Sequence, residues 1–236
     1  MISFGIIIPV FNSEDYLSEC LNSVIKQDYS NIEILLINDN SKDNSGEICD
    51  KVSNNHKNIS TIHFNENRGV AFCRNYGINY LRTDYIIFLD SDDYLIENIL
   101  NSLSNFIKRN AKCNVIVGRH KGQYSNYNND YFFNKKNNKN LSTMLLSIAQ
   151  YQYHSHYCWQ FVIKREFLNN FKLKFIDVKI TEDIDFVTRM LCFVNKLYYF
   201  DKTFYWQRST ENSLSKVRDV YTTISFLKVI HNLAIF

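Results

Sequence analysis

One stretch of the sequence limits the fold more than any other. An unbroken apolar run, Tyr85 to Leu89, ends directly in a cluster of carboxylates at Asp90, Asp92 and Asp93. A short run of β-branched and aromatic residues without polar alternation is typical of a strand buried on both faces of a parallel sheet. Open α/β sheets bind ligands beyond the carboxyl ends of such strands, where these acids lie. Asp90 and Asp92 can present oxygens to one hard divalent cation. The alternative is a solvated acidic turn that caps the next helix.

Short apolar runs alternate with segments of helical periodicity through the first half of the chain. Strands are predicted at Phe4–Val10, Ile32–Ile37, Ile59–Phe64, Tyr85–Leu89 and Asn114–Val117. Helices are predicted at Ser13–Lys26, around Ile48, from Val70 to Tyr80 and at Leu95–Lys108. This alternation predicts an α/β fold, with an open, mostly parallel, Rossmann-like sheet and helices on both faces.

Polar loops follow the predicted strands. They contain Asn12, Asp39 to Asp43, Asn67 to Gly69, and Asp90 to Asp93. Because the carboxyl ends of parallel strands meet at one edge of a sheet, these loops are expected to converge there. Asp15 follows Asn12 at the spacing of a capping box, so Asn12 is predicted to cap the first helix.

The second half of the sequence predicts a smaller acceptor-side region. Residues 119–140 are rich in Asn, Lys and Tyr, which indicates a long excursion, either a lid or a loop facing an acceptor. Thr181 is predicted to cap a helix whose first turn holds Glu182, Asp183 and Asp185. Acids in a first turn complement the helix dipole, so by themselves they do not establish a catalytic role. A helix at Leu141–Ala149 and strands at Leu197–Phe200 and Phe204–Trp206 are also predicted.

The last segment, residues 217–236, has the periodicity of an amphipathic helix. Its apolar positions are Val217, Val220, Ile224, Leu227, Ile230 and Ala234, with Lys216, Arg218 and Lys228 nearby. Two interpretations remain open. Either the helix packs its apolar face on the protein, or it lies with that face on an anionic membrane.

Composition narrows the functional classes. The 236 residues carry a formal net charge of +3, which is too weak to indicate nucleic-acid binding. Six cysteines are scattered without a C-x-x-C pair, so neither zinc nor thioredoxin-type chemistry is indicated, and a reducing cytosol is favoured. The chain opens on a core-strand pattern and has no apolar run long enough to span a bilayer, so a cytoplasmic protein is expected. Neither a G-x-G-x-x-G motif nor a P-loop is present.

Several short motifs fall on these predicted loops. They are Ile7–Asn12, Ile37–Asp43, Asn65–Asn75, Phe88–Asp93, the pair Glu182–Asp183, and Arg208–Ser213. Together they resemble the family 2 inverting glycosyltransferases, which have the GT-A fold. The resemblance implies one catalytic domain over residues 1–216, in which residues 1–118 bind the nucleotide sugar and residues 119–216 bind the acceptor. Residues 217–236 would form an appended helix.

The resemblance implies a nucleotide-sugar site built from most of these motifs. Its residues would be Pro9, Asn12, Asp39, Asn67, Arg68, Arg74, Asp90, Ser91, Asp92 and Arg208. Asp39 would bond the base or ribose, and Arg208 would lie near the diphosphate. Asp92 would bind Mn²⁺ or Mg²⁺ directly, and Asp90 would contact the ribose or the metal. Carboxylate oxygens suit these cations, which stabilise the charge that develops on a diphosphate leaving group.

On the acceptor side, the resemblance implies that Asp183 is the general base, with Glu182 as its supporting neighbour. A base within hydrogen-bond reach of the acceptor hydroxyl typically contributes about 10²–10⁴-fold to the rate. Asp185 is the second candidate for this role. The sequence departs from the family at one point, because many relatives have a metal-binding histidine where this chain has Thr210.

The implied function is the inverting transfer of a single sugar from UDP-hexose or UDP-N-acetylhexosamine to a hydroxyl of a glycan or lipid-linked glycan. The product would belong to a bacterial capsule, lipopolysaccharide or lipid-linked oligosaccharide. The expected location is the cytoplasm, including peripheral contact with the inner membrane. One alternative is an inactive transferase-like binding or assembly subunit. Another is a sugar-1-phosphate nucleotidyltransferase, although the acidic, glycine-free segment from Asn12 to Asp15 argues against its phosphate loop.

Overall fold

The computed structural model describes residues 1–122, 157–208 and 220–236. The helix expected at Leu141–Ala149, most of the excursion at 119–140, Thr210 and Val217 lie outside the described residues. Predictions that depend on them are therefore not compared with the structure.

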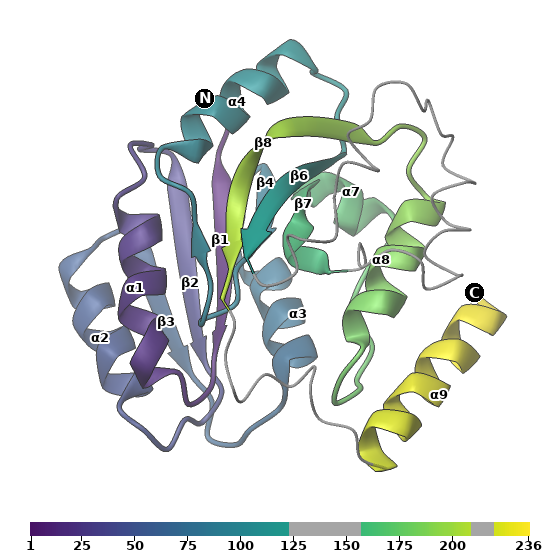
Figure 1. Cartoon of the computed structure of the whole chain (residues 1–236), viewed down its shortest axis with the longest axis horizontal. Coiled ribbons are helices and arrows are strands. Elements are labelled where there is room, and N and C mark those ends of the chain that lie inside the picture. The colour runs from purple at the N-terminus through teal and green to yellow at the C-terminus, as the bar shows by residue number, and fades with distance from the viewer. Residues whose placement is uncertain (123–156, 209–219) are drawn as a thin grey trace.

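The first half of the chain alternates strands and helices as predicted. Its elements are β1 (Phe4–Val10), α1 (Glu14–Ile25), β2 (Ile32–Asn38), α2 (Ser45–Asn55), β3 (Ile59–His63), α3 (Val70–Tyr80) and β4 (Tyr85–Phe88). Strand β1 lies between β2 and β4 and is parallel to both, and β3 continues the parallel set beyond β2. The polar loops after β1, β2 and β4 therefore meet at one edge of the sheet (Figure 1).

The second half extends the same sheet. Its elements are β5 (Tyr94–Leu95), α4 (Ile99–Arg109), β6 (Val115–Gly122), the 3₁₀ turn η1 (Cys158–Gln160), β7 (Phe161–Lys164), α7 (Arg165–Asn170), α8 (Glu182–Cys192), β8 (Tyr198–Gln207) and α9 (Val220–Ile235). Within the described ranges the strand order is β3-β2-β1-β4-β7-β6-β8-β5. Strand β7 is antiparallel to both β4 and β6. The α/β fold is confirmed, and the sheet is mixed in its second half.

Three predicted boundaries change. The helix expected from Leu95 begins only at Ile99, because Leu95 belongs to the short strand β5, which pairs with β8. The two strand patterns between Leu197 and Trp206 form the single strand β8, whose register against β6 shifts next to Arg119. Strand β6 continues to residue 122, so the predicted excursion begins inside a strand.

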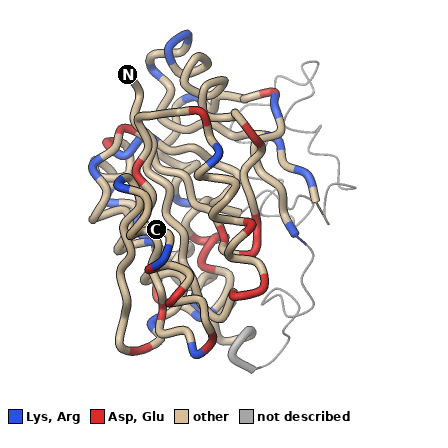
Figure 2. The backbone as a smooth tube through the Cα atoms, turned by 90° about the vertical axis from the view of Figure 1, so that its left-hand side faces the viewer, with Lys and Arg blue, Asp and Glu red and all other residues tan. Residues whose placement is uncertain are grey.

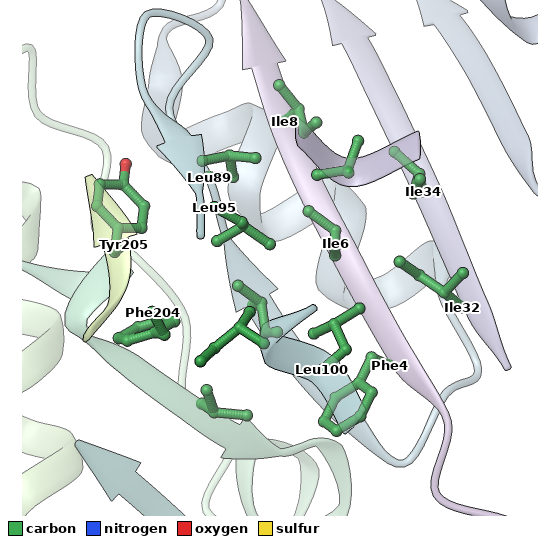
Figure 3. Close-up of a cluster of buried hydrophobic side chains, with 14 of the residues drawn as sticks. Phe4, Ile6, Ile8, Ile32, Ile34, Leu89, Leu95, Leu100, Phe204 and Tyr205 are labelled. Carbon is green, nitrogen blue, oxygen red and sulfur yellow. The ribbon is translucent and has the colours of Figure 1, made fainter. Parts of the chain in front are cut away.

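The hydrophobic core lies on both faces of the sheet, because side chains alternate along each strand. Ile6 and Ile8 of β1 face the cluster shown in Figure 3, which helices α1, α2 and α4 cover. Ile7 faces the second cluster, beneath α3, α7 and α8. Helix α9 packs against α8, to one side of the sheet (Figure 1). Among the helices in the described ranges, none is both long and apolar enough to cross a membrane.

Candidate functional site

Asp39 fixes the loop that connects β3 to α3. Its carboxylate accepts hydrogen bonds from the backbone N–H groups of Arg68 and Gly69, each at 2.8 Å. Gly69 has φ +85°, a conformation that favours glycine. The Asn67 side chain also reaches the backbone of Asp39, at 3.4 Å. Both carboxylate oxygens of Asp39 thus position the loop.

Asn12 closes the loop after β2. Its backbone has φ +48°, its side-chain oxygen accepts from the backbone N–H of Lys42 at 2.8 Å, and its own N–H donates to Ser41 at 3.1 Å. The predicted capping box is therefore wrong. The helix begins at Glu14, and the N–H of Glu14 donates to Asp43 at 3.0 Å.

Pro9 and Ser91 lie at the same edge of the sheet as the loops held by Asp39 and Asn12. Pro9 lies within β1, opposite Ile37. Ser91 follows β4, and its hydroxyl lies 2.7 Å from that of Ser13. Phe11, which the sequence motifs did not single out as a site residue, is 48% exposed directly after β1. Its place inside the Ile7–Asn12 motif, directly before Asn12, was the available signal.

Arg74 joins the two carboxylate motifs. This residue of α3 is only 3% exposed, and one of its terminal nitrogens donates to Glu182 at 2.7 Å and to Asp183 at 2.9 Å. The other terminal nitrogen donates to Asp90 at 2.8 Å. The guanidinium also lies over the ring of Phe175. One buried cation therefore holds the acids after β4 against those that begin α8, although about 90 residues separate them in the sequence.

The Glu182–Asp183 pair is buried at the start of α8. Burial raises the pKa of Glu182 to about 7, the adjacent Asp183 adds to the rise, and Arg74 opposes it. Burial also raises the pKa of Asp183, and Arg74 again opposes the rise. The second oxygen of Asp183 accepts from the backbone N–H of Cys158 at 3.2 Å. Asp183 is thus fixed in orientation by Arg74 on one side and by η1 on the other.

Two features near α8 differ from the sequence predictions. Thr181 precedes the helix as expected, but it has φ +68° and its hydroxyl donates to Ile180, so it makes no side-chain cap. Asp185, the second candidate base, is fully buried and bonded to Arg189 of α8 and Asn232 of α9. Asp185 therefore connects two helices, and both of its carboxylate oxygens have partners there.

Asp93 ties the end of β8 to the end of β4. Its carboxylate accepts from the hydroxyl of Tyr205 at 2.6 Å and from the backbone N–H of Arg208 at 2.7 Å. Burial raises the pKa of Asp93 to about 8, and Asp90 and Asp92 add to the rise. The sequence motifs assigned no separate role to Asp93. Its position as the third acid after an apolar strand was the available signal.

Two predicted donor-site arginines lie apart from Arg74. The guanidinium of Arg208 donates to the backbone oxygen of Asp92 at 2.9 Å and also pairs with Glu19 of α1. Arg208 is therefore next to the acids after β4, and its predicted place near a diphosphate stays a prediction. The guanidinium of Arg68 instead lies 3.8 Å from the ring centroid of Phe72.

The carboxylates after β4 suit a divalent-cation site whose remaining ligands come from a bound phosphate. Several acidic positions lie close together in one part of the backbone, and other acidic positions and the basic positions are spread over the rest (Figure 2). Among the residues that the structure describes, no three side chains of His, Cys, Asp or Glu form a ready metal cluster. Mg²⁺ is commonly held by one or two carboxylates together with substrate phosphates. Asp90 gives one oxygen to Arg74, so Asp90 and Asp92 suit such a shared site.

Relatives with known names extend over nearly the whole chain. The chain is 27% identical to glycosyltransferase GlyG of Streptococcus pneumoniae, with 94% of this chain and 78% of GlyG aligned. It is 30% identical to the glycosyltransferase EpsJ of Bacillus subtilis, over 90% of this chain and 63% of EpsJ. It is also 30% identical to the minor teichoic acid biosynthesis protein GgaB of the same species, over 91% of this chain but only 24% of GgaB.

Solved structures share the fold. TarS of S. aureus in complex with UDP-GlcNAc superposes with a TM-score of 0.80 at 23% identity, covering 99% of this chain and 66% of the TarS chain. The mannosyltransferase PcManGT of Pyrobaculum calidifontis, in complex with GDP-Man and Mn²⁺, has a TM-score of 0.67 at 13% identity and covers 99% and 64%. At these identities the likeness establishes the GT-A fold. The model of the family described as glycosyl transferase family 2 matches residues 5–171 and includes β4 with its acids, so this chain belongs to that family.

Proposed function

We propose that this protein is an inverting glycosyltransferase that moves one sugar from UDP-hexose or UDP-N-acetylhexosamine to a hydroxyl of a bacterial surface glycan. The observation that carries the proposal is the single buried Arg74 that bonds Asp90 on one side and Asp183 on the other. This contact supports the proposal, because Asp90 would be the donor-side acid and Asp183 the acceptor-side base beside it. The complex of TarS with UDP-GlcNAc and the teichoic acid relatives support a UDP-sugar and a surface polymer.

The donor would bind at the carboxyl edge of the sheet. Asp90 and Asp92 would hold Mn²⁺ or Mg²⁺ there, and the cation would offset the charge that develops on the leaving diphosphate. Arg208, next to the backbone of Asp92, adds a positive charge at the same end. The loop fixed by Asp39 and the exposed ring of Phe11 would border the base and ribose.

Asp183 would accept the proton of the attacking hydroxyl. Its burial favours the protonated acid, whereas Arg74 favours the carboxylate that a base requires. Glu182 shares the same arginine nitrogen, so it would help keep that guanidinium in place. With one base and no paired nucleophile, attack opposite the diphosphate inverts the anomeric centre.

The two alternatives lack comparable support. In a nucleotidyltransferase the loop after the first strand would receive phosphates, but here the N–H of Glu14, at the start of α1, already bonds Asp43. An inactive subunit would have no need for a base held in a fixed orientation, as Asp183 is here. We place the reaction on the cytoplasmic side of the membrane, with a glycan or lipid-linked glycan as acceptor and no nucleic acid.

Donor turnover tests the proposal. Purified protein would be given UDP-, GDP- and dTDP-sugars with Mn²⁺ or with EDTA, and the released nucleoside diphosphate would be measured. We expect cation-dependent release from a UDP-sugar, and its loss in Asp92→Asn. Failure to bind any donor, with or without the cation, would contradict the assignment. Donor binding without release, even when a cell-wall extract is added as acceptor, would favour the inactive subunit.

A further inference from the structure

The apolar stripe of α9 faces away from the protein. Ile224, Leu227 and Ile230 are 44%, 59% and 49% exposed. The buried side of the helix is marked instead by Ser225 and Val229. These three positions of the predicted stripe therefore do not pack on the protein, and the helix is held by its opposite side.

This helix carries an unusual share of the exposed apolar surface. Ten large hydrophobic side chains are exposed in the described residues, and half of them belong to α9 and the residue after it: Ile224, Leu227, Ile230, Ile235 and Phe236. Grouped exposed apolar side chains mark an interaction surface, whereas single ones do not. The helix contains no acidic residue, and Lys228 lies within the group.

A basic pocket adjoins the end of the same helix. It has a volume of about 300 Å³, and Lys172, Lys174, Arg189, Ile235 and Phe236 are among the residues that line it. The charge of Arg189 is matched by Asp185. The two lysines are exposed, and in the described part of the chain neither forms an ion pair. The pocket thus combines uncompensated positive charge with apolar walls.

We propose that the exposed face of α9, together with Lys172 and Lys174, binds the surface of an anionic phospholipid bilayer. An amphipathic helix of this kind lies in the interface, with apolar side chains among the acyl chains and lysines at the headgroups. Asn232, bonded to Asp185, and Phe236, 5.4 Å from the ring of Phe193, hold α9 to the body of the protein. A second copy of the chain would bring like charges to the same patch, whereas an anionic surface complements them. The inference does not depend on the transferase assignment.

Vesicle binding tests the inference. The purified 236-residue chain would be sedimented with vesicles of phosphatidylcholine alone or mixed with phosphatidylglycerol. We expect binding to the mixed vesicles, reduced but not abolished by high salt. The double variant Leu227→Ser with Ile230→Ser should lower the partition coefficient at least about tenfold, because two apolar side chains no longer enter the bilayer. Tyr80→Ser, which removes an exposed ring from α3, is the matched control and should not change it.

The basic contribution has its own pair of variants. Lys172→Glu with Lys174→Glu should reduce binding to the mixed vesicles about tenfold or more. Lys51→Glu with Lys57→Glu makes the same charge change at exposed positions of α2 and the following loop and should have a much smaller effect. Equal losses in the two charge variants, or no binding to the mixed vesicles, would overturn the proposal. The proposal would also be overturned if the wild-type protein did not bind vesicles but formed a dimer that the Leu227–Ile230 variant does not form. Donor turnover of the Leu227–Ile230 variant and of the lysine variants, measured without vesicles, should stay within twofold of wild type. This result would separate the test of membrane binding from the test of the catalytic site.

Discussion

In the first half of the chain, the candidate site residues directly follow strands of the sheet. In the second half, the candidate pair Glu182–Asp183 begins helix α8. Asp90 and Asp92 lie beyond β4 because parallel strands place their ends at one edge. Arg74 holds Glu182 and Asp183 next to Asp90, and the backbone N–H of Cys158 also holds Asp183. Sheet topology thus positions the proposed donor side, and a buried ion-pair network positions the proposed acceptor side.

This difference has an energetic consequence. A donor-side loop can tolerate local change, because several backbone hydrogen bonds hold it. The acceptor-side pair depends on one cation, and removing a single partner of a buried charge network leaves the others without compensation. We therefore expect different losses of stability and turnover when different arginines, or their partners, are substituted.

The largest effect is expected for Arg74→Met. Three carboxylates lose their shared partner, so the free energy of unfolding should fall by about 3–5 kcal/mol. Turnover should fall by more than about 10²-fold, because Asp183 loses its orientation. Urea unfolding and donor turnover measure the two effects. If the variant does not fold, Arg74→Lys keeps the charge but cannot bond all three acids, and it should lose turnover with a smaller loss of stability.

Arg82→Met is the matched control for Arg74→Met. Arg82 is exposed, and within residues 1–122, 157–208 and 220–236 its side chain bonds only the backbone oxygen of Asn79. Its removal should change the free energy of unfolding by less than about 0.5 kcal/mol. Similar losses in both variants would contradict the central role of Arg74.

A smaller, pH-dependent effect is expected for Asp93→Asn. The pKa of Asp93 is about 8 in the folded protein and near 3.8 in an exposed chain, so the folded state binds the proton more tightly. The stability that this group contributes is present below pH 4 and is lost as the pH rises toward 8. The free energy of unfolding, measured in EDTA at pH 5 and pH 8, should decline less between these pH values in Asp93→Asn than in wild type. An equal decline in both proteins would show that Asp93 does not cause it.

The smallest effect is expected for Glu19→Gln. The Arg208–Glu19 pair lies at the surface, and the backbone of Arg208 is held separately by Asp93. The free energy of unfolding should change by less than about 1 kcal/mol, since exposed ion pairs contribute little. A loss as large as that in Arg74→Met would remove the distinction between the two arginines.

The sequence was most informative where local pattern and topology agree. The apolar runs of β1, β2 and β4 predicted the strands, and the acids after β4 predicted the edge at which a donor would bind. The pairing of β7 between β4 and β6 was not predictable, because antiparallel insertion leaves no mark in a short apolar run. The single strand β8 was also missed, because polar residues around Asp201 interrupt its apolar pattern where the register shifts.

Side-chain roles were harder to predict than elements. Asp183 and Asp185 belong to the same first helical turn, and the local difference between them is only that Arg189 lies four residues after Asp185. In the structure Asp183 bonds Arg74 of α3 and Asp185 bonds Asn232 of α9, so long-range partners distinguish the two acids. The α9 stripe shows the same limit, because its period predicted a helix but not which side faces the protein.

The most direct test compares Asp183→Asn with Asp185→Asn in donor binding and in single-turnover transfer. We expect Asp183→Asn to bind the donor as wild type does but to transfer the sugar about 10²–10⁴-fold more slowly. Asp185→Asn should transfer at a rate within a few-fold of wild type and instead unfold more easily, because α9 loses a buried contact. Equal transfer rates in the two variants, or a loss of donor binding in Asp183→Asn, would contradict the assignment of Asp183 as the base.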